Sequence, residues 1–294
     1  MLSSAPSYDN LPLVSIGLPV YNSEKTISDA INTIRSQSTK NWELIISDNN
    51  SNDNTVSIVE KFVSIDNRIV LHKQKENIGM FPNFEFVLKQ AQGKYFHWLA
   101  ADDKRSVDFL NENISFLDAH PDFSASCSKK YFDSIGSDQN NNKNFSLEQE
   151  SAKARIDYLL KNIWQSHSIY YSVIRTEIIN KCQFLGEHFM AQDWIIDLYI
   201  AQQGKIAIQD RSYIIIGING ISRVNPYKPF RVSWIELFIP LYSFHKRFNI
   251  LIDYFSFFDK CALQLKIILL HIYIIRRRFI DFCAVFFKKK LGIF

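Results

Sequence analysis

The sequence lacks several features that would assign it quickly to a class. Its 294 residues contain four cysteines and no Cys-x-x-Cys pair, which predicts reduced, buried thiols instead of a disulfide framework. Neither G-x-G-x-x-G after the first apolar run nor G-x-x-x-x-G-K-[ST] occurs, which disfavours dinucleotide oxidoreductases and P-loop nucleoside triphosphatases. No basic stretch followed by an apolar run opens the chain, so we expect no secretory signal and a cytoplasmic location.

The net charge of +4 is too small to suggest that the whole chain binds nucleic acid. The charge is unevenly distributed, because residues 229–294 hold 11 Lys or Arg and four Asp or Glu, whereas residues 1–228 carry a net −3. We therefore expect two parts. Residues 1–228 would form a mildly acidic domain that is large enough to be catalytic, and residues 229–294 would form a basic, aromatic tail that meets an anionic or apolar partner.

Short apolar runs alternate with helical patterns over the first hundred residues. The runs at 13–20, 42–47, 68–72 and 94–101 are typical of buried strands. Because helical segments separate them, they predict an α/β fold with an open, mostly parallel, twisted sheet flanked by helices. Glycine at position 93 is expected to end the third helix as its C′ residue. The later pattern is weaker and predicts strands at 123–128, 167–175, 205–209 and 212–216, and a helix at 193–203.

Polar groups follow each of the first four expected strands. In a parallel sheet, ligands bind at the carboxyl ends of the strands, where the loops emerge. We therefore expect one functional edge, built from the segments Pro19-Val20-Tyr21-Asn22, Asp48-Asn49-Asn50, Asn77-Ile78-Gly79 and Asp102-Asp103.

Asp102 and Asp103 are adjacent carboxylates at the end of an apolar strand. Such a pair repels itself unless a cation neutralises it, and hard divalent ions such as Mn²⁺ or Mg²⁺ prefer oxygen ligands. Without a glycine-rich phosphate loop, a metal is also the natural partner of phosphate charge. The alternative is that both residues cap a following helix. Asp53, by contrast, is expected to cap the helix that begins at Thr55.

Three ordered segments carry a resemblance to a known family. VSIGLPVYN, WELIISDNNSNDNT and ENIGMFPNFEFVLKQAQGKYFHWLAADD closely resemble family 2 glycosyltransferases of the GT-A fold. The likeness is strong over residues 12–120, the expected nucleotide-sugar half with a Rossmann-like sheet, and weak over 121–225, within the acceptor half that extends to residue 228. It implies a nucleoside-diphosphate sugar donor and a metal-assisted transfer that inverts the anomeric centre.

The resemblance also implies roles for individual residues. Those at the first three strand ends would bind the nucleotide, and those at the fourth would bind the metal. The matching positions are Pro19, Tyr21 and Asn22 at the base pocket, with Tyr21 on the nucleoside, Asp48 and Asn49 at the base and ribose, Asn77 and Gly79 in the loop over the nucleoside, and Asp102, followed by Asp103, at the metal.

Two positions depart from the family pattern. Asn49 stands where an aspartate is frequent, which leaves the preferred base open, because an amide both donates and accepts. Ala100 stands where the Asp-x-Asp motif has its first acid. A single carboxylate then needs diphosphate oxygens and water to complete the shell of a cation, so metal affinity without donor is expected to be weak.

The general base is expected in the second half. Inverting transfer needs a carboxylate that accepts the proton of the attacking hydroxyl. HFMAQDWIIDLYIA resembles the family's Glu-Asp motif at a helix start, with Gln192 in place of the acid. Asp193 is therefore the candidate catalytic base, although it is also placed to cap its helix.

The tail contains no run of 18 apolar residues, which disfavours a membrane span. Leu263, Ile267, Leu270 and Ile274 recur at helical spacing before three arginines at 276–278. This pattern predicts amphipathic helices on the inner face of the plasma membrane, close to a lipid-linked saccharide acceptor. Packing on the catalytic body, or a homo-oligomer interface, is the alternative.

Together, these features favour a metal-dependent glycosyltransferase of capsule, O-antigen or exopolysaccharide synthesis. Two other functions stay open. One is a nucleotidyltransferase, although that class usually has a glycine-rich basic loop after the first strand. The other is a degenerate family member that acts as a membrane-bound scaffold, as Ala100 and Gln192 would allow.

Overall fold

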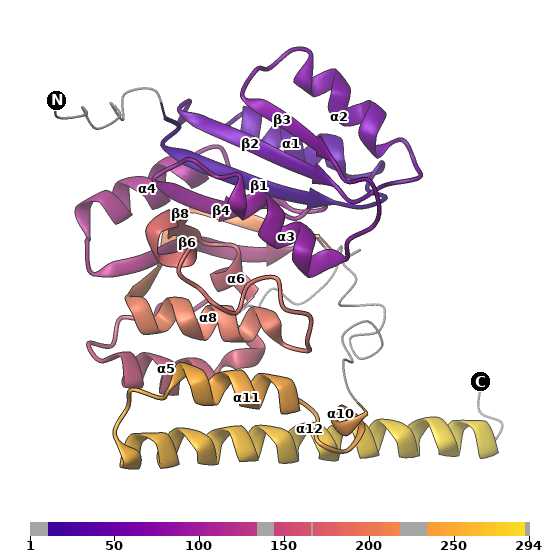
Figure 1. The fold of residues 1–294 in the computed structure, drawn as a ribbon, viewed down its shortest axis with the longest axis vertical. Helices are drawn as coiled ribbons and strands as arrows, with labels where there is room; N and C mark the ends of the chain where they lie inside the picture. Colours follow the sequence, from indigo (N-terminus) through magenta and orange to yellow (C-terminus); the bar gives the residue numbers. More distant parts are fainter. Residues whose placement is uncertain (1–10, 134–143, 166, 218–233, 292–294) are drawn as a thin grey trace, which may run out of the picture. The chain divides into compact units, whose positions relative to one another are not determined.

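The computed structural model describes residues 11–133, 144–165, 167–217 and 234–291. The chain divides into two compact units, one formed by residues 1–187 and 196–224 and the other by 188–195 and 225–294. None of the helices in these ranges is both long enough and apolar enough to cross a membrane. The elements of the first unit and of helix α8 (Figure 1) are β1 Val14–Val20, α1 Ile27–Arg35, β2 Trp42–Asp48, α2 Thr55–Val63, β3 Ile69–Lys73, α3 Met80–Lys89, β4 Tyr95–Trp98, β5 Lys104–Arg105, α4 Phe109–Ala119, β6 Phe123–Phe132, α5 Ala152–Lys161, a 3₁₀ turn Ile163–Gln165, α6 His167–Tyr170, β7 Val173–Arg175, α7 Thr176–Ile179, α8 Gln192–Gln203 and β8 Lys205–Ile216.

One eight-stranded sheet forms the centre of the first unit, in the order β3-β2-β1-β4-β7-β6-β8-β5. Strands β3, β2, β1 and β4 are parallel neighbours, whereas β7 runs antiparallel to both β4 and β6. The expected α/β sheet, mostly parallel and flanked by helices, is therefore confirmed. The four predicted strands of the first hundred residues all lie in its parallel half.

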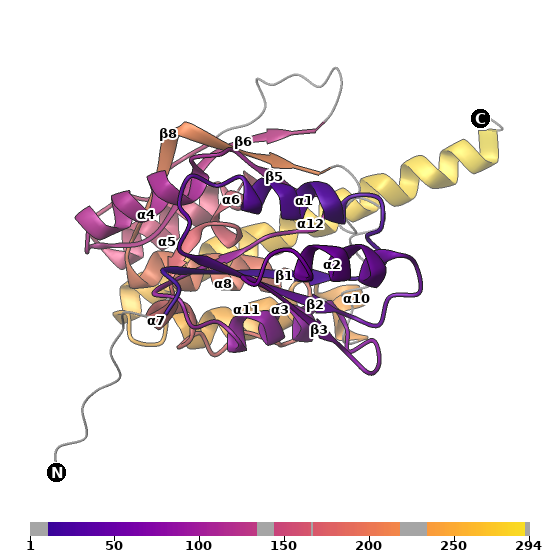
Figure 2. The same cartoon turned by 90° about the horizontal axis from the view of Figure 1, so that it is seen from above.

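The two faces of this half are covered by different helices (Figure 2). On one face, Ile16 and Leu18 of β1 belong to a buried cluster with Ile31 of α1 and Val59 of α2. On the other face, α3 lies so close to β1 that a Cβ added to Gly17 would meet the Val87 side chain at 2.6 Å. Because both faces are covered, every residue of β1 is buried, as expected for a central parallel strand.

Two predictions for the later strands are wrong in detail. Residues 167–175 are not one strand, since α6 precedes the short β7. Tyr170 stacks on Trp98 with ring centroids 4.7 Å apart, and such a contact overrides the strand preference of aromatic residues. The two strands predicted at 205–216 are a single strand, β8. Its pairing with β6 is irregular between Ser128 and Lys129, which accounts for the break in the sequence pattern.

Gly93 does not act as the C′ residue of α3. The helix ends at Lys89 with Gln90 as its cap. Gly93 instead lies against the β1 backbone, where its N–H donates to Ser15 Oγ at 2.8 Å. A Cβ at this position would lie 2.6 Å from the Ser15 backbone nitrogen, so the position requires glycine because of close approach.

We expect Gly93→Ala to lower the free energy of unfolding by about 1–3 kcal/mol, because the extra methyl group must displace backbone. Urea denaturation followed by circular dichroism measures this change. Gln92→Ala is the matched control, since the Gln92 side chain is exposed and its backbone N–H is retained. Equal loss in the two variants would contradict the close-approach explanation.

Candidate functional site

The loops that follow β1 and β2 are joined by hydrogen bonds at the carboxyl edge of the sheet. Asn22 has a left-handed backbone with φ of 50°. Its N–H donates to Ser51 Oγ at 2.9 Å, and its Oδ1 accepts from the Asn52 N–H at 3.0 Å. Asp53 adds a second link, because it accepts from the backbone N–H groups of both Glu24 and Thr55. Asp53 therefore satisfies the first N–H of helix α2, although Asn54 is the N-cap residue, and it also ties the two loops together.

Asp48 ends β2 and is 2% exposed. Its Oδ2 accepts a hydrogen bond from the Ser51 N–H at 3.0 Å. Its Oδ1 is buried and has no hydrogen-bond partner among the described residues. A buried carboxylate oxygen without a donor costs about 1–3 kcal/mol or more, so Asp48 has an acceptor ready for a ligand N–H or O–H.

Asn49 is fully engaged in holding the loop before α3. Its Nδ2 donates to Asn77 Oδ1 at 2.9 Å and to the Gly79 carbonyl at 3.2 Å. Its Oδ1 accepts from the Ile78 N–H at 2.8 Å. A carboxylate could not donate the first two bonds, which explains physically why an amide stands here. Asn77 in turn accepts from the Gly79 N–H, and Gly79 has φ of 91°.

Pro19 and Tyr21 lie at the end of β1 in different environments. Pro19 is buried within the strand, in register with Ser47. Tyr21 is 47% exposed, so it is not part of the core and a ligand can reach it. The edge expected from the sequence thus unites the β1, β2 and β3 ends, through the hydrogen bonds of Asn22 and Asn49.

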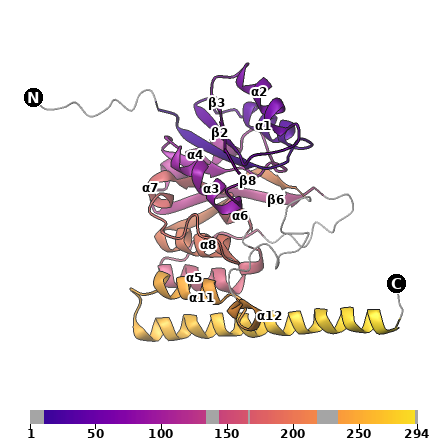
Figure 3. The same ribbon diagram turned by 45° about the vertical axis from the view of Figure 1, so that its right-hand side comes forward.

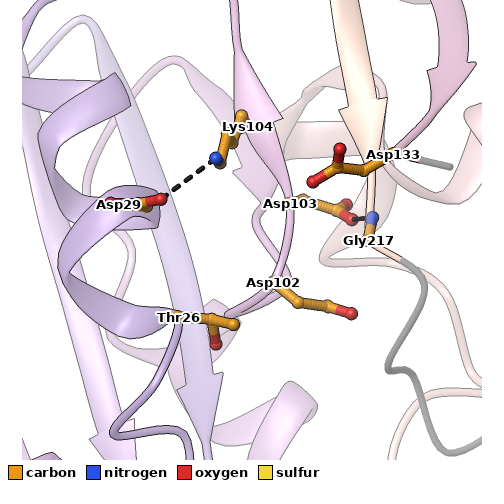
Figure 4. Close-up of a pocket in the computed structure, with 7 residues that line it drawn as sticks. All are labelled: Thr26, Asp29, Asp102, Asp103, Lys104, Asp133 and Gly217. Atoms are coloured by element: carbon orange, nitrogen blue, oxygen red, sulfur yellow. Dashed lines mark hydrogen bonds and ion pairs between the residues drawn. The ribbon is translucent and has the colours of Figure 1, made fainter. Parts of the chain in front are cut away.

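The acidic turn after β4 lines a pocket between α1 and the ends of β6 and β8 (Figure 4). Asp102 and Asp103 are followed by strand β5, so the alternative that they cap a helix is wrong. Lys104 of β5 forms an ion pair with Asp29 of α1 at 3.0 Å. The complete lining is Thr26, Asp29, Asp102, Asp103, Lys104, Asp133 and Gly217.

The two aspartates of the turn have different environments. Asp103 is 2% exposed, with Oδ2 3.5 Å from Arg105 Nη2 and Oδ1 accepting from the Gly217 N–H at 3.0 Å. Burial raises the pKa of Asp103, although Arg105 and the Gly217 N–H oppose the shift. Asp102 is partly exposed, and no hydrogen bond or ion pair to its carboxylate is recorded within the described ranges. Asp103 would have to exchange partners to reach a cation, whereas Asp102 would not.

Arg105 and His97 form a buried network behind the acidic turn that sequence reasoning missed. Arg105 Nε donates to His97 Nε2 at 3.1 Å, and His97 Nδ1 faces the Ser172 carbonyl at 3.3 Å. Because Nε2 must accept, the proton of the neutral ring lies on Nδ1. Burial and the Arg105 charge hold the pKa of His97 well below its ordinary value. The sequence did contain one signal of this network, because a cationic residue, Arg105, stands two positions after Asp103.

Asp193 lies in the first turn of helix α8, directly after Gln192, and belongs to the second unit. Burial raises the pKa of its carboxyl to about 6, against backbone hydrogen bonds at Trp194 and at its own N–H that favour the charged form. A carboxylate with this pKa is mostly ionised at neutral pH yet basic enough to accept a proton.

The described residues contain no group of three or more His, Cys, Asp or Glu side chains that could hold a metal ion. The groups of the pocket lining that could bind a cation are hard oxygens, and among them Asp102 is the carboxylate that would not have to exchange a partner. Such a set fits Mn²⁺ or Mg²⁺ when phosphate oxygens supply the remaining ligands.

The profile of a family described as Glycosyl transferase family 2 matches residues 15–182. The chain is 37% identical over 106 residues to TuaG of Bacillus subtilis, a glycosyltransferase named for teichuronic acid biosynthesis, covering 36% of this chain and 42% of TuaG. It is also 37% identical over 105 residues to WfgD of Escherichia coli, named as a UDP-Glc:alpha-D-GlcNAc-diphosphoundecaprenol beta-1,3-glucosyltransferase, covering 36% and 41%. The chain thus spans about two-fifths of the length of these curated relatives.

Solved structures share the fold. S. aureus TarS in complex with UDP-GlcNAc has a TM-score of 0.57 at 21% identity, over 70% of this chain and 59% of that one. The mannosyltransferase PcManGT of Pyrobaculum calidifontis, solved with GDP-Man and Mn²⁺, has a TM-score of 0.53 at 18% identity, over 73% and 59%. The expected GT-A fold is confirmed by these likenesses.

We expect Asn49→Asp to loosen the loop at 77–79, because carboxylate oxygens would face the Asn77 and Gly79 oxygens instead of donating to them. Loss of these two partly buried hydrogen bonds should cost about 1–3 kcal/mol. Hydrogen–deuterium exchange should be faster at Ile78 and Gly79. Asn22→Asp is the matched control, since only the Oδ1 of Asn22 is used and an aspartate accepts equally well. Unchanged exchange in Asn49→Asp would contradict the role of the amide.

Proposed function

The chain belongs to glycosyl transferase family 2, and from this premise we propose that it transfers a sugar from a nucleoside-diphosphate sugar to a saccharide acceptor, with inversion at the anomeric carbon. Residues 1–228 would form the catalytic domain, with the donor bound by residues 12–120 and the acceptor by 121–228. The observation that carries this proposal is the edge of the sheet where Asp48 has an unsatisfied buried oxygen and Asp102 lines an acidic pocket.

The nucleoside would be held at the ends of β1 to β3. The free Asp48 Oδ1 is an acceptor for an N–H of the base, which is the kind of group that uracil and guanine both offer. The exposed Tyr21 ring supports stacking, and Pro19 and Asn22 would form the wall beneath it. Asn49 would act by holding Asn77 and Gly79, which close over the nucleoside. In donor binding, Asn49 would therefore position this loop.

The diphosphate would be held at the acidic turn. Asp102 would be the main metal ligand, with Asp103 as a further carboxylate and diphosphate oxygens completing the shell. Bound Mn²⁺ or Mg²⁺ would neutralise the negative charge that develops on the departing nucleoside diphosphate. Mn²⁺ in the structure of PcManGT supports the choice of ion.

Asp193 would serve as the general base. The acceptor hydroxyl oxygen forms a bond to the anomeric carbon while the bond from that carbon to the diphosphate oxygen breaks. The hydroxyl proton passes to the Asp193 carboxylate, and the nucleoside diphosphate leaves. The raised pKa of Asp193, about 6, makes it a stronger base than an ordinary aspartate at neutral pH.

The acceptor would be a lipid-linked saccharide in the synthesis of a bacterial surface polysaccharide. The diphosphoundecaprenol in the name of WfgD and the polysaccharide in the name of TuaG support this class. A screen of UDP-, dTDP- and GDP-sugars with Mn²⁺, read by mass spectrometry, tests the function. Release of nucleoside diphosphate supports it, whereas no release from any donor favours a scaffold. Release of pyrophosphate from a nucleoside triphosphate and a sugar phosphate would indicate a nucleotidyltransferase.

We expect Asp102→Asn to weaken UDP binding in the presence of Mn²⁺ at least about tenfold, because a neutral amide coordinates a divalent ion poorly. Isothermal titration calorimetry measures the affinity for UDP, first with Mn²⁺ and then with EDTA. In EDTA, the variant and the wild type should bind UDP with equal affinity. Asp108→Asn makes the same charge change at an exposed site outside the pocket and should bind as the wild type does. Full Mn²⁺-dependent affinity in Asp102→Asn would rule out its metal role.

For Asp193, we expect kcat/KM to fall as the pH drops through about 6, because a carboxyl whose pKa is raised to that value is protonated below it and cannot accept a proton. At pH 5, the rate should be about tenfold below its plateau.

Asp193→Asn should lower the rate about 10²–10⁴-fold at every pH and leave UDP affinity unchanged, and Asp193→Glu should recover part of the activity. A wild-type profile that stays flat between pH 5 and 7 would argue against this base.

A further inference from the structure

The second unit contains helices α10 Ile235–Phe238, α11 Tyr242–Leu251 and α12 Phe257–Leu291. Figure 3 shows α11 running beside the long α12. His245 of α11 is hydrogen-bonded to Gln264 of α12 at 2.6 Å, and its ring centroid lies 5.4 Å from that of His271. The side chains of Arg278 and of residues 281–291 lie outside the described set.

The apolar stripe that the sequence suggested for a membrane faces inward. Leu263 and Ile267 are fully buried, and Ile274 is 3% exposed. His271, on the same side of the helix, is also buried. This stripe is buried, so it is not the face that would enter a bilayer.

A second apolar stripe runs along the opposite side of α12 and is exposed. Its members recur at intervals of three and four residues, the spacing of one helix face, over about 21 Å. We call it the outer stripe: Leu265 at 57% exposure, Ile268 at 48%, Leu269 at 56%, Ile272 at 55%, Ile275 at 47% and Phe279 at 66%.

Between Asp259 and Asp281 of α12, the charged side chains are all cationic. Residues 261–280 include Lys266 and three consecutive arginines but no aspartate or glutamate. Arg276 and Arg277 have exposed side chains. An apolar stripe bordered by cations and free of anions complements the acyl chains and phosphate headgroups of an anionic bilayer.

We propose that the outer stripe of α12 docks the protein on an anionic phospholipid bilayer, with the helix lying in the interface and its inner stripe packed on the protein. The arginines meet lipid phosphates while Leu265, Ile272 and Phe279 enter the acyl boundary. This surface goes beyond the proposed sugar transfer and does not depend on it, because docking needs neither donor nor metal. It would hold the enzyme where a lipid-linked acceptor resides.

A second copy of the chain is the competing occupant. A two-fold interface buries the same patch of both copies, so the cations around each stripe would be brought toward their counterparts without carboxylates from residues 261–280 to pair them. Like charges at an interface oppose association, and the observations therefore favour lipid.

Flotation of the full-length protein with vesicles of 30% phosphatidylglycerol and 70% phosphatidylethanolamine tests the proposal. We expect binding to these vesicles and little to phosphatidylcholine alone. Leu265→Gln/Ile272→Gln should abolish most binding. Arg276→Gln/Arg277→Gln should lower the partition coefficient about 30-fold, because each cation near such a surface contributes roughly fivefold.

The matched control is Ile65→Gln/Val107→Gln, which removes two exposed apolar side chains from the first unit and should float as the wild type does. UDP affinity, measured on all variants, reports that they are folded. Equal vesicle binding by wild type and outer-stripe variant would overturn the proposal. A second result would also overturn it: the wild type does not bind vesicles but forms a concentration-dependent dimer in sedimentation, and Leu265→Gln/Ile272→Gln converts this dimer to a monomer. Loss of sugar transfer with intact flotation would count against the proposed function alone.

Discussion

Strand β1 is the constraint on which the donor side of the molecule depends. It is hydrogen-bonded along both edges, with Val20 in register with Asp48 of β2 and Gly17 in register with Trp98 of β4. Both of its faces are covered, so a shift by one residue would exchange its buried side chains between two different helix layers. Because the pairing is parallel, this fixed register also sets which residues leave the sheet together. Asp48 comes to the edge beside Tyr21, and the acidic turn four residues beyond Trp98 comes to the same edge.

Asp48, the last residue of β2, and Asn49, which follows it, have different roles because one is a carboxylate and the other an amide. Asp48 keeps one oxygen for a bond within its own turn and leaves the other buried and unsatisfied. The side-chain amide of Asn49 forms its hydrogen bonds with the loop that leads into α3. A carboxylate at both positions would bring negative charge toward the Asn77 and Gly79 oxygens. The departure from the family pattern therefore identifies a structural bond, and it leaves Asp48 as the acceptor through which a base could be recognised.

Much of the first half could be predicted from the sequence, because buried parallel strands and amphipathic helices leave different periodicities, and their carboxyl ends must share an edge. What could not be predicted are contacts that join distant segments. The stacking of Tyr170 on Trp98 turned an expected strand into a helix, and the approach of Gly93 to Ser15 gave that glycine a reason unrelated to helix ends. The ion pair of Asp103 with Arg105 likewise depends on burial. From the sequence, the two aspartates are equivalent, whereas the fold neutralises one and leaves the other open.

Helix α12 is the clearest case in which sequence pattern alone was ambiguous. Apolar residues occupy both of its sides at helical spacing, so the sequence pattern contains two apolar stripes and does not show which of them is buried. Helix α11 determines which side is buried. Its His245 is hydrogen-bonded to Gln264 and its ring packs near that of His271, so this side of α12 faces inward. Once that side is buried, the other must meet water or a partner, and exposing a continuous apolar stripe to water is unfavourable. In the proposed docking, the arginines near the stripe would favour an anionic surface over a like-charged copy of the chain.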